Sequence, residues 1–273
     1  MILPKIFLKN LISESKSKNK IFLRNSAKEY LQILVLDFIY SNPKYRELIF
    51  YGGSCLAHCF GLPRLSEDLD FVDLKKKIIL PVLAKDLKAY FKNLDLKMVP
   101  TIQKFRLYLK FPLLRELGLS GEHETDLLFL KIEIFKEFAF KRGSKIEMVP
   151  LFKFNQSILV RSFDLPTLMS TKIRAILWRK FEKTDKEGKV FIKVKGRDYF
   201  DLMWYLDQGV TPNFKCLEIK DKTKLKEKLL EIVKKVDARS IKLDMESLIE
   251  DQNFVLNLSK NIKEILIKKV SQL

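Results

Sequence analysis

The chain has 273 residues, of which 47% are hydrophobic and 11% aromatic. This composition can bury a core, so it excludes a wholly disordered chain, and 9 Gly and 9 Pro are too few for a fibrous or loop-dominated protein. Lys and Arg number 52 against 34 Asp and Glu, for a net charge of +18. Such a charge suits a polyphosphate, a nucleic acid or an anionic membrane surface, although a lysine-rich surface with no specific partner fits as well.

The N-terminus does not resemble a signal peptide, because Lys5 and Lys9 interrupt its apolar stretch and no small-residue cleavage site comes after it. No run of uncharged apolar residues is long enough to span a bilayer, so we expect no membrane partner. Three unevenly spaced cysteines do not form a disulfide framework. We therefore expect a protein of the reducing cytoplasm.

The first part of the chain alternates between strand and helix patterns. Apolar residues at helical or alternating spacing predict, in chain order, helix 28–41, strand 47–53, helix 54–62, strand 68–74, helix 78–93 and strands 104–111, 127–135 and 157–163. This order indicates a mixed α/β domain that carries the chemistry.

After Leu165 and Pro166 the pattern becomes helical. It predicts helices over 166–181 and 197–209, a charged loop over 182–196, and two or three Lys-rich helices up to the last residue. The sequence therefore predicts an α+β protein, with an α/β domain at 1–165 followed by a helical domain at 166–273.

A Gly-Gly-Ser turn lies where the strand over 47–53 meets the next helix. Gly52 and Gly53 let the backbone approach a phosphate closely, and the free N–H groups of Gly53 and Ser54 favour its negative charge. Most such turns are merely tight turns, so this turn becomes a specific signal only in combination with acidic residues on the next strand.

Two aspartates lie on that next predicted strand. Asp68 and Asp70 are two residues apart, so they share one face of the strand while Leu69 and Phe71 face the core. Like charges side by side repel, and a sequence selected for stability alone has little reason to pair them. A divalent cation removes the repulsion, and Mg²⁺ prefers carboxylates together with substrate phosphates.

The stretch GGSCLAHCFGLPRLSEDLDF resembles the signature of the AbiEii/AbiGii toxin family, within the DNA polymerase β-like nucleotidyltransferase superfamily. Gly52, Gly53, Arg64, Ser66 and the two aspartates match the motif. The resemblance implies a nucleotidyltransferase core. It also implies a role in a toxin–antitoxin or abortive-infection system. The cognate antitoxin of such a system would counteract the toxin without forming a lasting complex with it.

The superfamily carries a third carboxylate on a later strand, and Glu133 occupies that position, with Lys131 on the same strand face. The family more often has Asp here, and Glu can also ligate a metal. The resemblance implies that Asp68, Asp70 and Glu133 hold two Mg²⁺ and that Lys131 contacts substrate. A solvated strand face or an ion pair between Lys131 and Glu133 is the structural alternative.

Two helical blocks also resemble the family. LPTLMSTKIRAILWR places Lys172 and Arg179 on neighbouring helical rows, and GRDYFDLMWYL places Asp198 and Asp201 on one helix face. The family resemblance implies that Lys172 contacts the nucleotide phosphates and that the other three help bind the nucleotide or the acceptor. The structural alternative is an interdomain salt bridge.

Cys55, His58 and Cys59 fall within one helical turn, which is cramped for zinc and lacks a fourth ligand. We expect them to pack inside the protein.

Together these features predict a Mg²⁺-dependent transfer of a nucleoside monophosphate from an NTP to an acceptor hydroxyl, with RNA, tRNA especially, as the acceptor. Gly53 and Ser54 would cradle the triphosphate, Lys172 would offset charge on the departing pyrophosphate, and Glu133 or a metal-bound hydroxide would accept the proton. Arg64 and Ser66 would brace the aspartate strand or reach the triphosphate. Two alternatives remain: transfer to a small-molecule or protein hydroxyl, and a non-catalytic nucleic-acid-binding protein on the same scaffold.

Overall fold

A computed structural model describes residues 3–121, 125–138, 143–179, 181–184, 187–188 and 190–273. The chain divides into two compact units. Unit 1 comprises Met1–Ala139 and Ile146–Ser162, and unit 2 comprises Phe140–Lys145 and Phe163–Leu273. The expectation that 1–165 and 166–273 fold as separate domains stays a prediction.

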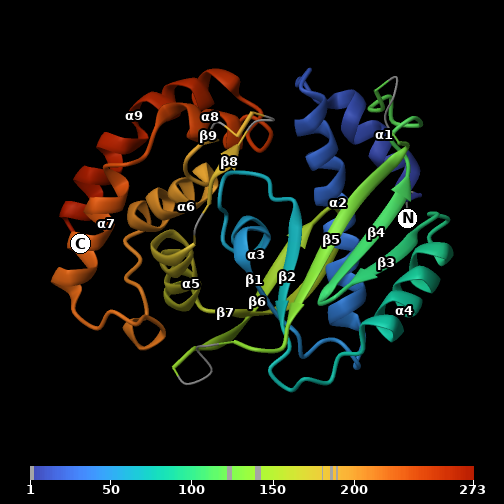
Figure 1. Cartoon of the computed structure of the whole chain (residues 1–273). Coiled ribbons are helices and arrows are strands. Elements are labelled where there is room, and N and C mark those ends of the chain that lie inside the picture. The colour runs from blue at the N-terminus through green and yellow to red at the C-terminus, as the bar shows by residue number, and fades with distance from the viewer. Residues whose placement is uncertain (1–2, 122–124, 139–142, 180, 185–186, 189) are drawn as a thin grey trace. The chain divides into compact units, whose positions relative to one another are not determined.

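Unit 1 is built on one mixed sheet (Figure 1). Its strands are β1 (Ile49–Tyr51), β2 (Asp68–Val72), β3 (Val99–Gln103), β4 (Arg106–Pro112), β5 (Leu127–Phe135), β6 (Ile146–Lys153) and β7 (Gln156–Phe163). They lie in the order β3-β4-β5-β2-β1-β7-β6. Strand β2 pairs parallel with β5 and antiparallel with β1, while β4 pairs antiparallel with both β3 and β5.

Three helices pack on this sheet: α2 (Lys20–Ser41), α3 (Gly52–Cys59) and α4 (Leu80–Asn93). Helix α1 (Pro4–Glu14) packs on α2. Helix α2 begins at Lys20 rather than at the predicted residue 28, because the Asn19 side chain caps it by accepting from the N–H groups of Ile21 and Phe22. The sequence reasoning expected no helix where α1 lies.

One face of the sheet forms the core of unit 1. Leu107, Leu109 and Phe111 alternate along β4 and are fully buried, opposite buried residues of β5. The ring of Phe91 on α4 lies 5.0 Å from that of Phe111, and α2 passes behind β4 and β5 in Figure 1. Burying each such side chain stabilises the fold by about 1.5–3 kcal/mol. The period-two pattern therefore leaves the polar residues of these strands on the opposite face.

Unit 2 is mainly helical: α5 (Leu165–Trp178), α6 (Gly196–Asp207), the 3₁₀ turn η1 (Phe214–Cys216), α7 (Lys222–Val233), α8 (Ala238–Met245) and α9 (Gln252–Ser271). Four of its α-helices begin at an aspartate whose carboxylate accepts from a backbone N–H of the first turn: Asp164, Asp221, Asp237 and Asp251. Such caps stabilise a helix by about 1 kcal/mol each. The predicted α+β class, with a mixed-sheet core followed by helices, is confirmed.

Several elements differ from the prediction. The expected loop over 182–196 contains two short paired strands, β8 (Lys183–Thr184) and β9 (Val190–Ile192), because Ile192 is apolar and buried; residues 185–186 and 189 lie outside the described part. The edge strands β3 and β6 were not predicted. In the part of the chain that the structure describes, no helix has the length and apolar content needed to cross a membrane.

Candidate active site

The strand register brings the predicted carboxylates onto one face of the sheet. Asp70 on β2 lies between Tyr51 on β1 and Glu133 on β5, and Asp68 lies beside Lys131. The neighbours Leu69 and Phe71 are fully buried on the other face, as the alternation predicts. Residues that are more than 60 positions apart in the sequence are therefore neighbours.

Two cations hold this acidic group. The ammonium of Lys131 lies 2.9 Å from Asp68 Oδ2 and 3.3 Å from Glu133 Oε1. Arg106 on β4 donates from Nε to the same Glu133 oxygen at 2.6 Å. Sequence reasoning missed Arg106, although the alternation of β4 places it on the polar face. The ion pair between Lys131 and Glu133, expected as the structural alternative, is present.

The three acids and two cations leave Asp70 as the least compensated group. Burial, followed by the charges of Asp68 and Glu133, raises the pKa of Asp70 to about 7, and Lys131 only partly opposes this. Burial alone would also raise the pKa of Glu133, but Lys131 and Arg106 hold it below its ordinary value. Asp70 is therefore the carboxyl whose ionised form the two cations do not stabilise, and it takes up a proton near neutral pH unless a further cation is present.

The glycines of the turn are required by this crowding. Gly52 has a φ of +84°, and a Cβ there would lie 2.5 Å from Asp70 Oδ2. A Cβ on Gly53 would lie 2.8 Å from Arg64 Nη2 and 3.0 Å from Ser66 Oγ. Position 52 therefore requires glycine, and a side chain at position 53 would displace the Arg64 guanidinium. The backbone at the start of α3 can consequently approach the aspartate strand.

The remaining residues of the motif support the strand. The Ser54 hydroxyl donates to the backbone oxygen of Asp68. Arg64 is buried and donates from Nη1 to the oxygen of Leu65 at 2.8 Å, and Gln32 on α2 donates to the oxygen of Ser66 at 2.9 Å. These contacts fix the segment that leads from α3 into β2.

The cysteines and histidine of α3 are packed inside the protein. Cys55 and His58 are buried, and the His58 ring hydrogen-bonds Gln32 Oε1 at 2.8 Å. Burial lowers the pKa of His58 to about 3, so the ring is neutral. Among the described residues no group of three or more His, Cys, Asp and Glu side chains is arranged to hold a metal ion.

The predicted residues of the helical blocks form a second cluster, which lies wholly in unit 2. Lys172 on α5 pairs with Asp198 at 2.8 Å and with Asp201 at 2.7 Å, both on α6. Arg179 adds a contact of 3.3 Å to Asp198. Burial alone would raise the pKa of Asp198, but Lys172, with Lys195 and Arg179, lowers it to about 2. The expected salt bridge exists, but it joins two helices of one unit rather than two domains.

A cavity of about 970 Å³ opens beside this cluster. Basic residues dominate its charged lining: Arg179, Lys193, Lys195 and Lys235 against Glu182 and Asp198. Burial and the neighbouring Arg197 lower the pKa of Lys195 to about 8. The cavity can therefore accommodate an anionic group.

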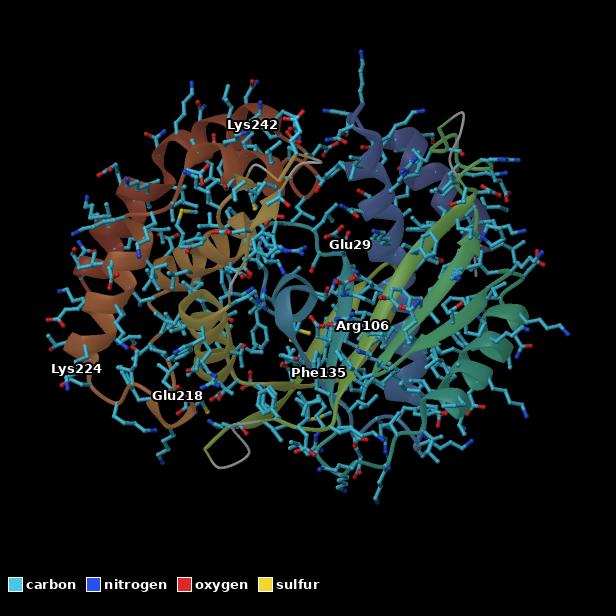
Figure 2. All side chains as sticks on the ribbon, in the orientation of Figure 1. Glu29, Arg106, Phe135, Glu218, Lys224 and Lys242 are labelled. Atoms are coloured by element: carbon cyan, nitrogen blue, oxygen red, sulfur yellow. The ribbon has the colours of Figure 1, made fainter. Side chains whose placement is uncertain are left out.

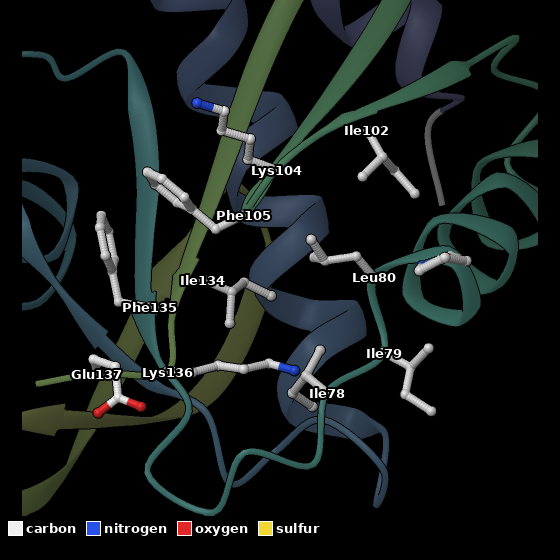
Figure 3. Close-up of a pocket in the computed structure, with 11 residues that line it drawn as sticks. Ile78, Ile79, Leu80, Ile102, Lys104, Phe105, Ile134, Phe135, Lys136 and Glu137 are labelled. Carbon is white, nitrogen blue, oxygen red and sulfur yellow. The ribbon is translucent and has the colours of Figure 1, made fainter.

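A second, apolar cavity of about 610 Å³ lies in unit 1 at the end of the sheet (Figure 3). Its walls come from the start of α4, the β3–β4 hairpin and the end of β5. Phe105 and Phe135 form one side, with ring centroids 5.1 Å apart. Phe135 is two residues beyond Glu133 on β5, but Asp68, Asp70 and Glu133 are not among the residues that line this cavity.

The fold resembles that of a nucleotidyltransferase of known structure. MenT4, a nucleotidyltransferase toxin from Mycobacterium tuberculosis H37Rv, matches with a TM-score of 0.58 and 10% identity, covering 98% of this chain and 90% of that one. JHP933 from Helicobacter pylori matches with a TM-score of 0.46 and 17% identity, covering 89% of this chain and 92% of that one. No curated protein matches the sequence. The fold is thus that of a nucleotidyltransferase.

The family assignment is more specific. Residues 37–268 match the model of the nucleotidyl transferase AbiEii toxin family of type IV toxin–antitoxin systems. The chain belongs to this family, and it is accordingly an enzyme of the nucleotidyltransferase class. The resemblance expected from the motifs is confirmed.

Proposed function

We propose that the enzyme transfers a nucleoside monophosphate from an NTP to a hydroxyl of RNA, tRNA in particular, with a divalent metal ion. The observation that carries the proposal is the gathering of Asp68, Asp70 and Glu133 on one sheet face, directly beside the Gly52-Gly53 turn. A carboxylate cluster of this kind is unfavourable in the absence of a cation, and a phosphate chain beside it needs the same cation.

The chemistry of the two aspartates at this position fits Mg²⁺, while Glu133 is paired with Arg106 and Lys131. Asp68 and Asp70 supply hard oxygen ligands from one strand face, and Mg²⁺ is commonly held by one or two carboxylates together with substrate phosphates. We assign these two residues as ligands and Glu133 as the third carboxylate. When bound, the metal supplies positive charge that stabilises the negative charge developing on the phosphates and lowers the pKa of the acceptor hydroxyl.

The triphosphate would bind at the start of α3. The first N–H groups of a helix lack intrahelical partners and favour an anion, and Gly53 and Ser54 contribute such groups. The Ser54 hydroxyl already donates to Asp68, so we assign its backbone N–H to the phosphate and its side chain to the support of β2. Arg64 and Ser66 act by holding this segment in place.

The acceptor would approach from the Glu133 side. Its hydroxyl oxygen forms a bond to the α-phosphorus while the bond from that phosphorus to the bridging oxygen breaks, and pyrophosphate leaves. Arg106 and Lys131 keep Glu133 ionised, and its carboxylate would receive the hydroxyl proton. Lys131, which pairs with Asp68 and Glu133, would offset part of the charge of the acidic face between turnovers.

The Lys172 cluster is a second part of the proposal, and its role rests on the family resemblance. Asp198 and Asp201 hold the Lys172 ammonium between them, which fixes its position. We assign Lys172 and Arg179 to the phosphates and the two aspartates to their orientation, with the basic cavity providing space beside them.

The biological proposal rests on the family. An enzyme that adds nucleotides to an essential RNA in the cytoplasm would arrest growth unless a cognate antitoxin counteracts it. The net charge of +18 supports a polyanionic acceptor.

A labelling experiment tests the proposal. The wild-type chain is incubated with each α-labelled NTP in turn, Mg²⁺ and total RNA, and the RNA is examined for covalent label. Asp70→Asn is the inactive variant, and Asp95→Asn, which removes an exposed carboxylate at a turn, is the matched control. We expect label with wild type and Asp95→Asn only.

Each other outcome has a definite meaning. Label on protein or on a small molecule would replace RNA by another acceptor. RNA binding with no label from any NTP would favour a non-catalytic nucleic-acid-binding protein.

A further inference from the structure

The sheet face that α2 and α4 do not cover carries rings and cations in register with the carboxylates. On β5, Phe129 and Lys131 lie on the same face as Glu133, since alternate residues share a face. On β4, Lys110 lies opposite Phe129, and Tyr108 lies opposite Lys131. A row of aromatic and basic side chains therefore leads away from the proposed site.

An exposed ring lies beneath a cation at two places, on β5 and at the turn before β4. Phe129 is 41% exposed, and the Lys110 ammonium lies 5.9 Å from its ring centroid. Phe105 is 37% exposed, with the guanidinium of Arg106 at 4.9 Å. Figure 2 shows Arg106 on the side of the sheet that faces the viewer, in front of α2. We call Phe105, Arg106, Tyr108, Lys110 and Phe129 the β4–β5 platform.

This combination fits single-stranded nucleic acid. Every base offers a flat face that stacks on an aromatic ring, and every phosphate offers a negative charge to a lysine. Sheets that present rings in this way bind the splayed bases of single-stranded RNA. A double helix hides its base faces and cannot use the rings.

The strand order gives the platform a direction. In the order β4-β5-β2-β1, the carboxylates of β2 separate the platform on β4 and β5 from the turn that comes after β1. The triphosphate is assigned to that turn, so the platform lies on the side from which the acceptor would enter. Arg106, which pairs with Glu133, marks the point where the platform meets the carboxylates.

We propose that the β4–β5 platform binds the single-stranded 3′ segment of the acceptor RNA, with a base stacked on Phe129 and a phosphate held by Lys110. This inference rests on the proposed transfer to RNA, and it adds the surface that selects a single strand with a free end.

The test measures binding without catalysis. The probe is a 5′-labelled single-stranded RNA of about a dozen nucleotides of mixed sequence, titrated with the full chain in EDTA and without NTP. Phe129→Leu keeps an apolar side chain and removes the ring; we expect about tenfold weaker binding. Phe129→Trp should bind as wild type does, and Lys110→Gln should lower the slope of log affinity against log salt by about 0.7.

Matched variants control for general effects. Phe152→Leu removes a ring that is 75% exposed on β6, at the opposite edge of the sheet, and Lys97→Gln removes an exposed lysine outside the platform. Both should bind the probe as wild type does, and the melting temperatures of all variants should agree. The blunt duplex of the same sequence should compete poorly.

The outcomes separate this inference from the proposed function. If Phe129→Leu and Lys110→Gln bind the probe as wild type does, the platform proposal is overturned even where labelling of RNA succeeds. If no NTP labels RNA but the variants bind the probe more weakly, as expected, the platform proposal is supported and the transfer proposal fails. Where both hold, the variants should raise KM for RNA and leave kcat unchanged.

Discussion

Unit 1 and unit 2 each contain a cluster of acidic and basic side chains, but the charges are balanced differently. In unit 2, Lys172 contacts Asp198 and Asp201 directly, and the pKa of Asp198 falls to about 2. In unit 1, Lys131 pairs with Asp68 and Arg106 pairs with Glu133, and the pKa of Asp70 rises to about 7.

The difference separates two roles that motifs alone do not distinguish. A cluster whose charges are already paired contributes to a folded framework, whereas one with an unpaired charge is arranged for a charge that arrives with the ligand. Both clusters were singled out from family motifs, and only the geometry shows that one is neutralised. Substitutions in the unit 1 cluster should therefore act mainly on activity, and those in the unit 2 cluster should lower stability as well as activity.

Replacing Asp70 should have the largest effect on activity. Asp70→Asn keeps the volume and removes the uncompensated charge, so we expect transfer to fall at least a hundredfold, about 2.7 kcal/mol in barrier. The melting temperature in EDTA at pH 8 should hold or rise, because the buried like charges no longer repel. Transfer above about a tenth of wild type, a barrier change under about 1.4 kcal/mol, would contradict the assignment.

Replacing Lys172 should have the largest effect on stability. Lys172→Ala leaves two buried carboxylates without their cation, and breaking such a buried pair costs about 3–5 kcal/mol. Urea unfolding followed by tryptophan fluorescence reports this directly, since Trp178 and Trp204 both lie in unit 2. Lys224→Ala, at an exposed position of α7, is the matched control and should leave the free energy of unfolding unchanged.

A double-mutant cycle then tests the assignment of Lys172 to the phosphates. Lys172→Ala combined with Asp198→Ala should recover part of the stability, because one unpaired carboxylate is removed, but it should not recover transfer. Joint recovery of stability and transfer would reduce Lys172 to half of a structural ion pair.

The pH dependence of unit 1 should reveal two opposing groups. The folded pKa of His58 is about 3, below that of an unfolded histidine, so its contribution to stability is lost as pH falls from about 6.5. The folded pKa of Asp70 is about 7, above that of an unfolded aspartate, so its contribution grows as pH falls from 7 to about 4. In metal-free wild type the two slopes cancel.

Removing either group should unmask the other. Asp70→Asn should lose up to about 1.4 kcal/mol of unit 1 stability per pH unit between pH 6.5 and about 5, above the range where Glu133 titrates, and Asp70→Asn with His58→Gln should lose much less over that range. Amide hydrogen exchange of β1 and β2 in EDTA measures this. If the wild-type protein loses stability with falling pH as steeply as Asp70→Asn does, the pKa of Asp70 is not raised in the folded protein.

The smallest effect is expected at Arg179. Its side chain is 44% exposed and contacts Asp198 at 3.3 Å, while Lys172 already pairs with that carboxylate. Arg179→Gln should therefore change the free energy of unfolding by less than about 1 kcal/mol. A larger change, measured by urea unfolding, would mean that the cluster depends on two cations rather than one.

The sequence carried enough information for the local part of the site. Alternation placed Asp68 and Asp70 on one face and Lys131 with Glu133 on another strand, and it required no knowledge of pairing. The salt bridges of Arg106 with Glu133 and of Lys131 with Asp68 depend on the register between strands that are distant in the sequence, which no local pattern encodes.

Edge elements were missed for a related reason. Strands β3 and β6 contain Pro100 and Pro150, and proline weakens a strand assignment although edge strands tolerate it. The alternation of residues along β4 predicts its polar face. That this face forms one surface with Phe129 of β5 follows only from the strand pairing.

The order of the chain through the two units restricts how the protein can be divided for expression. The segment 140–145 belongs to unit 2 although β6 and β7, which come after it, belong to unit 1. Asn213 donates from its side chain to the oxygen of Gly143, and Asp164 donates from its backbone N–H to the oxygen of Lys145. A fragment that starts at residue 166 would lack these partners. A circular permutant or a genetic fusion that restores them is the better route to an isolated helical unit.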